Sequence, residues 1–161
     1  MADLTPLDEK LAEVLGLAQA AQTATDRVAS MEDAERFEQQ LTRMREEAAE
    51  TERRTDALID GLDGKKTAIR DMARETKSEA SEMMRTYLEG EEEALDGFEF
   101  LTMAEAGELG HWEIVQTMAE ASGEREVKQL ADWAVEVQRR HLELVRTASL
   151  ELAREEVGAA A

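Results

Sequence analysis

Apolar residues recur along the chain at alternating steps of three and four, which is the pattern of a helix that buries one stripe of its surface. Three such stripes run through residues 7–28, 34–62 and 69–87. Two more lie on either side of Gly123, at 101–118 and 127–148. The pattern therefore predicts an all-α chain of five helices.

Local signals indicate where these helices begin and end. Thr5 is suited to cap the first helix, and Pro6 is suited to its first position, where an N–H is not needed. Because Pro6 is the only proline, nothing after it interrupts a helix. A polar break near Ser30, the glycines of "DGLDGKK", Gly90 and Gly123 supply the later boundaries.

The order of the helices predicts the architecture. The first and second form one long hairpin, the fourth and fifth form another, and the third crosses between them. We expect a four-helix bundle with an additional crossover helix, built as one domain over residues 1–161, with residues 157–161 frayed. Only 4% of the residues are aromatic, so the predicted core is a narrow seam lined by alanine.

Charge and composition exclude several classes of function. The formal net charge of −19 repels the phosphate groups of nucleic acids and of anionic lipids. We therefore expect neither nucleic acid nor an anionic membrane as a partner. The absence of cysteine excludes disulfides and thiolate metal sites. The segment "MADLTPLDEK" lacks the basic and apolar parts of a signal peptide, and no apolar run is long enough to span a membrane. We expect a cytoplasmic protein.

Titratable side chains fall on the last two apolar stripes, whereas the first two stripes are apolar or carry threonine. Glu108 and His111 occupy consecutive positions of the fourth stripe, and His141 lies on the fifth. Counted from the turn between the two helices, Glu108 lies level with Gln138, and Glu105 lies level with His141. Buried groups of this kind need partners, which are either a metal ion or hydrogen bonds within the core.

At these residues the chain resembles a known superfamily. The segment "GEREVKQLADWAVEVQRRHLELV" resembles the last helix of rubrerythrin-type members of the ferritin-like superfamily. The segment "GHWEI" and the order of the helices are similar to the small YciF-type ferritin-like stress proteins. The resemblance implies a ferritin-like bundle with a di-iron centre, in which carboxylates and Glu-x-x-His pairs converge at mid-bundle.

The residues of the second hairpin match that centre only in part. His141 matches the family histidine, but Gln138 stands where the family has a carboxylate. Two alignments of the preceding helix remain open. One places the family's ligands on Glu105 and Glu108, and the other places them on Glu108 and His111.

The first hairpin departs further from the family pattern. Glu13 and Glu47 lie at the right depth, but both lie beside the apolar stripes, and neither begins a Glu-x-x-His pair. We therefore expect a mononuclear or incomplete metal centre for iron, or for manganese or zinc. Its candidate ligands are Glu108, His111 and His141, together with Glu105 or Glu136.

Two functions follow from these residues. The resemblance implies a stress-associated protein whose bound iron is oxidised by oxygen or peroxide, at most an oxidase or peroxidase-like activity. The alternative is a non-catalytic scaffold or interaction protein that keeps the fold and has lost the metal. Long helices rich in alanine also favour a homodimer, with Trp133 as a residue that faces the second copy or another protein partner.

Overall fold

The computed structural model describes residues 2–160, and it describes side chains as far as residue 158. Five α-helices and one 3-10 turn make up the described part, which contains no strand. Their bounds are α1 Pro6–Ala29, the turn η1 Ala34–Phe37, α2 Glu38–Asp60, α3 Lys66–Leu88, α4 Ala94–Ser122 and α5 Arg125–Ala160. The predicted all-α class and the five helices are confirmed.

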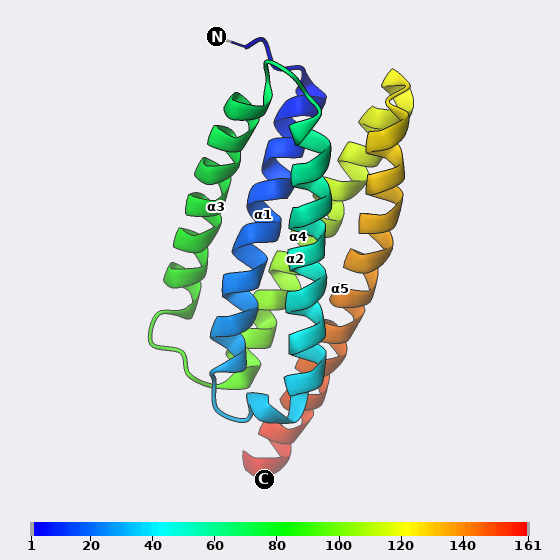
Figure 1. The fold of residues 1–161 in the computed structure, drawn as a ribbon. Coiled ribbons are helices and arrows are strands. Elements are labelled where there is room, and N and C mark those ends of the chain that lie inside the picture. Colours follow the sequence, from blue (N-terminus) through cyan, green and yellow to red (C-terminus); the bar gives the residue numbers. More distant parts are fainter. Residues whose placement is uncertain (1, 161) are drawn as a thin grey trace.

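The helices lie side by side along one long axis (Figure 1). Helix α1 packs against α2 and α4, and α5 packs against the same two helices from the other side. These four surround the core, while α3 lies against α1 at the edge of the molecule (Figure 1). Because α3 runs the full length between the two hairpins, α2 and α4 point in the same direction.

Helix α1 begins as the sequence predicts. The Asp8 N–H donates to Thr5 Oγ1 at 3.1 Å, and the Thr5 N–H donates to Asp8 Oδ2 at 2.8 Å, which forms a capping box. Lys65, from the link before α3, adds a hydrogen bond to Asp8 at 2.9 Å. Burial alone raises the pKa of Asp8, but the bonds from Thr5 and Lys65 outweigh it and lower that pKa.

The core combines many alanines with larger apolar side chains. Phe37 and Phe98 stack edge to face with ring centroids 4.9 Å apart, and Trp112 is 1% exposed. Between α1 and α3 the backbones come very close at Gly16. A Cβ at this glycine would overlap the carbonyl oxygen of Ala73 and lie 2.8 Å from the Cβ of Thr76. Helix α3 is therefore held by close backbone contact.

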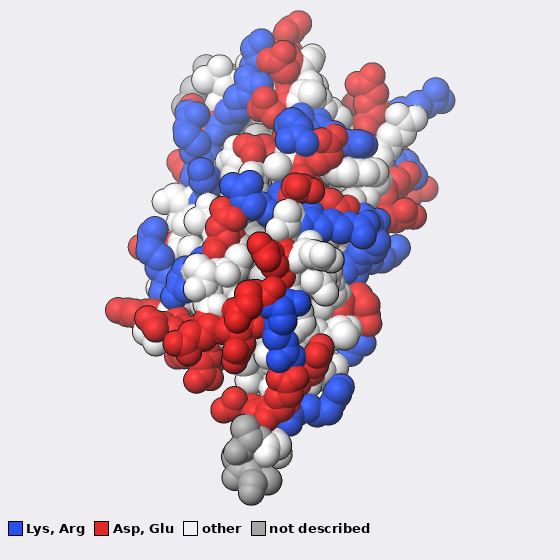
Figure 2. Space-filling model, turned by 60° about the horizontal axis from the view of Figure 1, so that its bottom comes forward, with Lys and Arg blue, Asp and Glu red and all other residues white. Residues whose placement is uncertain are grey.

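Two connections are joined at the end of the bundle where α1 ends and α4 begins. The Glu32 N–H donates to the Glu92 carbonyl at 2.9 Å, and the Ala94 N–H donates to the Glu32 carbonyl at 3.1 Å. Acidic side chains crowd this end of the molecule (Figure 2). The neighbouring carboxyl of Asp96 raises the pKa of Glu91, as expected where like charges meet.

Helix α5 continues as far as Ala160, and residue 161 lies outside the described residues. The fraying expected for residues 157–161 stays a prediction. Over the described residues, no helix combines the length and the apolar character needed to cross a membrane.

Candidate functional site

Four buried polar side chains meet between α4 and α5. Glu105 is 2% exposed, Glu108 4%, Gln138 1% and His141 2%. The Gln138 Nε2 donates to Glu108 Oε2 at 2.6 Å, and His141 Nδ1 lies 3.5 Å from Glu105 Oε2. The two pairs expected from the sequence, Glu108 with Gln138 and Glu105 with His141, are thus found. The rise per residue is the same in both antiparallel helices, so residues equally far from the turn lie opposite each other. We call these four residues the buried cluster.

Helix α2 adds Glu47 at the edge of the buried cluster. Glu47 Oε1 lies 3.3 Å from His141 Nε2, so the imidazole stands between the carboxylates of Glu47 and Glu105. The other carboxyl oxygen of Glu47 accepts from Arg140 at 2.5 Å, and Arg43 lies 3.2 Å from Oε1. The side chain of Glu47 is 21% exposed. Its position beside the apolar stripe was expected, but its contact with His141 was not.

The two carboxylates favour the charged form of His141. Burial is the largest single effect and lowers the pKa of this imidazole, but Glu105 and Glu47 together outweigh it, so the pKa lies above its usual value. Glu47 responds in the opposite sense. Burial raises its pKa, yet the contacts with His141 and Arg140 prevail and lower it.

Glu108 favours the protonated form. Burial raises the pKa of Glu108 well above its usual range, the charge of Glu105 raises it further, and the hydrogen bond from Gln138 only partly offsets these effects. Strongly perturbed carboxyls of this kind occur at functional sites and also in structural networks.

Two acceptor atoms of the buried cluster lack a donor. Within the described residues, Glu105 Oε2 and Gln138 Oε1 are fully enclosed and have no hydrogen-bond partner. Nearly all buried polar atoms in proteins are satisfied, so such atoms indicate a missing proton, ion or water. The buried cluster therefore has an excess of acceptors over donors.

His111 and Glu136 do not join the buried cluster. His111 is 37% exposed at the side chain, its Nδ1 lies 2.8 Å from the Gly107 carbonyl, and its Nε2 lies 3.3 Å from Glu13. The expectation that His111 lies in the buried seam is wrong, because three helical residues beyond Glu108 the side chain has turned about 60° away from α5 and toward α1. Glu136 is exposed on α5 and points away from the other candidates.

The side chains as placed do not form a preassembled metal site. Among the described residues, no group of three or more His, Cys, Asp or Glu side chains is arranged to hold a metal ion. Within the buried cluster, Glu105 Oε2 and His141 Nδ1 form a carboxylate–imidazole pair 3.5 Å apart. A cation held here would also need Gln138 Oε1 or a rotation of Glu108 away from its present hydrogen bond. The donor types nevertheless suit Fe²⁺, Mn²⁺ or Zn²⁺, which accept imidazole and carboxylate ligands.

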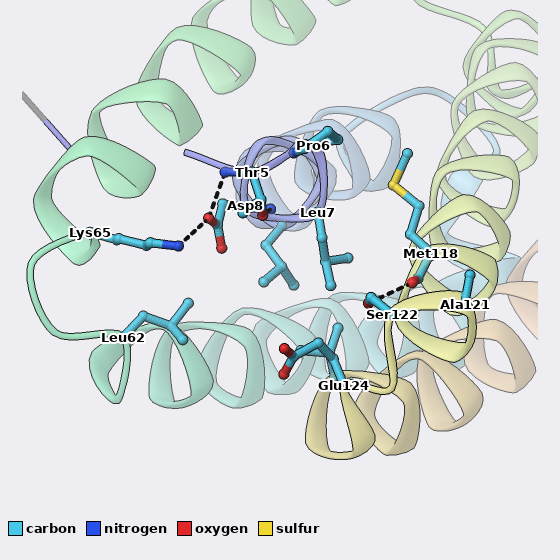
Figure 3. A pocket seen from close by; sticks show the side chains of 12 residues that line it. Thr5, Pro6, Leu7, Asp8, Leu62, Lys65, Met118, Ala121, Ser122 and Glu124 are labelled. Atoms are coloured by element: carbon cyan, nitrogen blue, oxygen red, sulfur yellow. Dashed lines mark hydrogen bonds and ion pairs between the residues drawn. The ribbon is translucent and has the colours of Figure 1, made fainter. Parts of the chain in front are cut away.

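Several hollows open on the surface of the bundle, and two of them bear on the site. One, of about 460 Å³, lies at the end near the N-terminus between the start of α1, the α2–α3 link and the α4–α5 turn (Figure 3). The other, of about 260 Å³, is a groove between α1, α3 and α4 that reaches Glu108. The groove connects the buried cluster with the surface.

Trp133, which we expected to face a second copy or another partner, packs against a residue of its own chain. The Arg54 guanidinium lies over its ring, 4.1 Å from the ring centroid.

Comparisons of the chain with protein-family models, with curated proteins and with solved structures give no match. Fold and site together define an all-α helical bundle with a buried carboxylate and histidine cluster.

Proposed function

We propose that this protein is a ferritin-like helical bundle that binds one divalent cation in the buried cluster, with iron first and manganese or zinc next. The observation that carries the proposal is the pair of enclosed acceptors without donors, Glu105 Oε2 and Gln138 Oε1, beside an imidazole nitrogen 3.5 Å from the first of them. A cation is one kind of group that satisfies acceptors of this type. A role in oxidative or general stress belongs to the same proposal.

Several residues of the buried cluster would serve as ligands of such an ion. Glu105 supplies a carboxylate and His141 supplies Nδ1, while the contact of Nε2 with Glu47 fixes the ring. A bound cation would take the place of the proton that the charged imidazole carries on Nδ1. Gln138 offers a neutral oxygen, and Glu108 supplies a second carboxylate once it turns from Gln138. Bound iron would supply one-electron redox chemistry with oxygen or peroxide.

Calorimetric titration of metal-free protein with Fe²⁺ under argon tests this proposal, with Mn²⁺ and Zn²⁺ in parallel. We expect about one ion per chain, and a loss of roughly tenfold or more in affinity in Glu105→Gln, since a ligand matters at least as much as the groups that orient it. Glu136→Gln is the matched control on the exposed face and should bind as the wild type does. The proposal fails if no saturable binding occurs or if Glu105→Gln binds like Glu136→Gln.

A second candidate function is a metal-free scaffold, and the bond between Glu108 and Gln138 favours it. A protonated Glu108 is neutral and already has a partner, and His141 balances the charge of Glu105. This candidate predicts the same melting temperature with Fe²⁺ and with a chelator. A rise in melting temperature that saturates with Fe²⁺ excludes it, because a ligand that binds only the folded state stabilises that state.

We also propose that the chain forms a homodimer. Its alanine-rich helix faces support this proposal, because small side chains allow helices of two copies to pack closely. Sedimentation velocity over a wide concentration range tests this. A species of twice the chain mass supports the dimer, and a single-chain mass at every concentration excludes it.

A further inference from the structure

The groove that reaches Glu108 is built from one face of each of three helices. Small side chains of α1, including Ala20 and Ala24, form its floor. Met83 on α3 forms part of one wall, and Met103 and Gly107 on α4 form part of the other. Both methionines are more than half exposed, at 68% and 51%, so their flexible side chains stand at the rim. The result is a narrow apolar slot with an adaptable edge.

A buried carboxyl lies against this apolar slot. Glu108 is 4% exposed and lines the groove, and its Oε2 accepts the hydrogen bond from Gln138. Its second oxygen, Oε1, accepts no hydrogen bond among the described residues, and it is not one of the fully enclosed unpaired atoms. Because Glu108 lines the groove, this free oxygen is available to a molecule lying there.

The charges around this end of the groove determine which charge the head group of a bound molecule can carry. Glu105 neighbours Glu108, Glu13 lies beside His111 at the same end, and the chain carries a net charge of −19. The ring nitrogens of His111 already face the Gly107 carbonyl and Glu13. An anionic head would be repelled, whereas a head that carries positive charge and only donates hydrogen bonds complements the surplus of acceptors.

We propose that the groove binds a slender alkylamine, with the alkyl chain along the alanine floor and the ammonium group hydrogen-bonded to Glu108 Oε1, from which the carboxyl proton leaves to solvent as the cation binds. This site shares Glu108 with the metal site proposed above, but it needs no metal. The volume of about 260 Å³ lies just below the usual range for drug-sized ligands, which fits a thin single chain better than a ring system.

The test uses metal-free protein with labelled methionine methyl groups, followed by NMR during titration with octylamine at pH 7. Met83, Met84 and Met103 line the groove, whereas Met118 lines the hollow at the end of the bundle. We expect saturable shifts at the three groove methionines and none at Met118. Octanoate, with a tail of the same length, should bind at least roughly tenfold more weakly because its head is anionic.

Two glycine variants in the same helix give a matched comparison. A Cβ at Gly107 or at Gly110 meets no atom within 4 Å, so both positions accept a larger residue, but only Gly107 lines the groove. Gly107→Leu should weaken octylamine binding by roughly tenfold or more, and Gly110→Leu should leave it within roughly twofold.

Several results would overturn the proposal. These are unsaturable shifts, shifts at Met118 instead, equal binding of octanoate, or equal binding by Gly107→Leu and the wild type. Shifts of the groove methionines that depend on protein concentration without octylamine would assign the groove to a second copy of the chain. Because no metal is present, failure here leaves the metal proposal standing, and failure of metal binding leaves this one.

Discussion

Glu108 and Gln138 lie 30 residues apart in the chain and face each other across the α4–α5 interface, joined by a hydrogen bond of 2.6 Å. The ferritin-like pattern that the sequence resembles has a carboxylate where Gln138 stands. An amide there can donate to Glu108, whereas a carboxylate would repel it in a site with so little water. Gln138 is therefore compatible with a buried cluster that is stable without an ion.

Replacing Gln138 by leucine should destabilise the protein by about 1–3 kcal/mol, because Glu108 would remain buried without a donor. Urea unfolding of the metal-free protein measures this. The double variant Glu108→Leu with Gln138→Leu should recover at least half of the loss, since no polar group is then left unpaired. Simple addition of the two single effects would show that the bond contributes nothing of its own.

Stability should fall as the pH rises above about 4.5, where an unfolded glutamate titrates, and further above about 6.5, where an unfolded histidine titrates. The folded-state pKa values of Glu108 and His141 are both raised, so the folded protein binds these protons more tightly than the unfolded chain does. Their contributions are complete below the unfolded pKa values and are lost as the pH rises through the folded ones. Asp8 and Glu47, whose pKa values are lowered, lose their contribution only as the pH falls below about 4.5.

Urea unfolding between pH 6 and 9 measures this pH dependence. Glu108→Gln should reduce the decline, because the part due to Glu108 is then absent. A free energy of unfolding that stays level or increases above pH 6.5 would contradict the assignment of both groups.

His141 and His111 should differ strongly in their effect on stability. His141→Leu removes the partner of two carboxylates and should cost about 3 kcal/mol or more, as in other broken buried ion pairs. His111→Leu changes a half-exposed side chain and should stay within about 0.5 kcal/mol. Thermal unfolding monitored by circular dichroism suffices, and equal effects would argue against the placement of the two rings.

Gly16→Ala should destabilise the protein by about 1–3 kcal/mol, because the added methyl group overlaps the backbone of α3. Gly107→Ala is the natural control. It lies within α4, where a Cβ meets no atom within 4 Å, and it should raise stability by about 0.5–1 kcal/mol through helix propensity alone. If both substitutions stabilise, the close contact between α1 and α3 is not as tight as described.

The sequence predicts the helices well, and it predicts the positions of the polar residues along the bundle axis equally well. Both have a physical reason. Helical rise is constant, so counting from the turn places Glu108 beside Gln138 and Glu105 beside His141. Capping chemistry is equally local, and Thr5 caps α1 as expected. Both properties depend on residues that are close in the chain or symmetric about one turn.

Rotation about the helix axis is harder to predict, because it is fixed by contacts between distant helices. The apolar pattern places His111 on a stripe and Glu47 beside one, and a shift of about 60° decides whether such a residue faces the core. His111 faces α1 and solvent, whereas Glu47 reaches His141. Nothing in the residues next to either position reveals this difference.

The bridge between Glu32 and the segment Glu92–Ala94 joins two connections that both carry acidic side chains. Two backbone hydrogen bonds thus act against a concentration of negative charge at the acidic end of the bundle (Figure 2). Dissolved salt screens that repulsion but leaves the hydrogen bonds nearly unchanged. Amide hydrogen exchange at Glu32 and Ala94 should therefore slow as ionic strength increases. The local stability of this junction would then depend on the salt concentration around the protein.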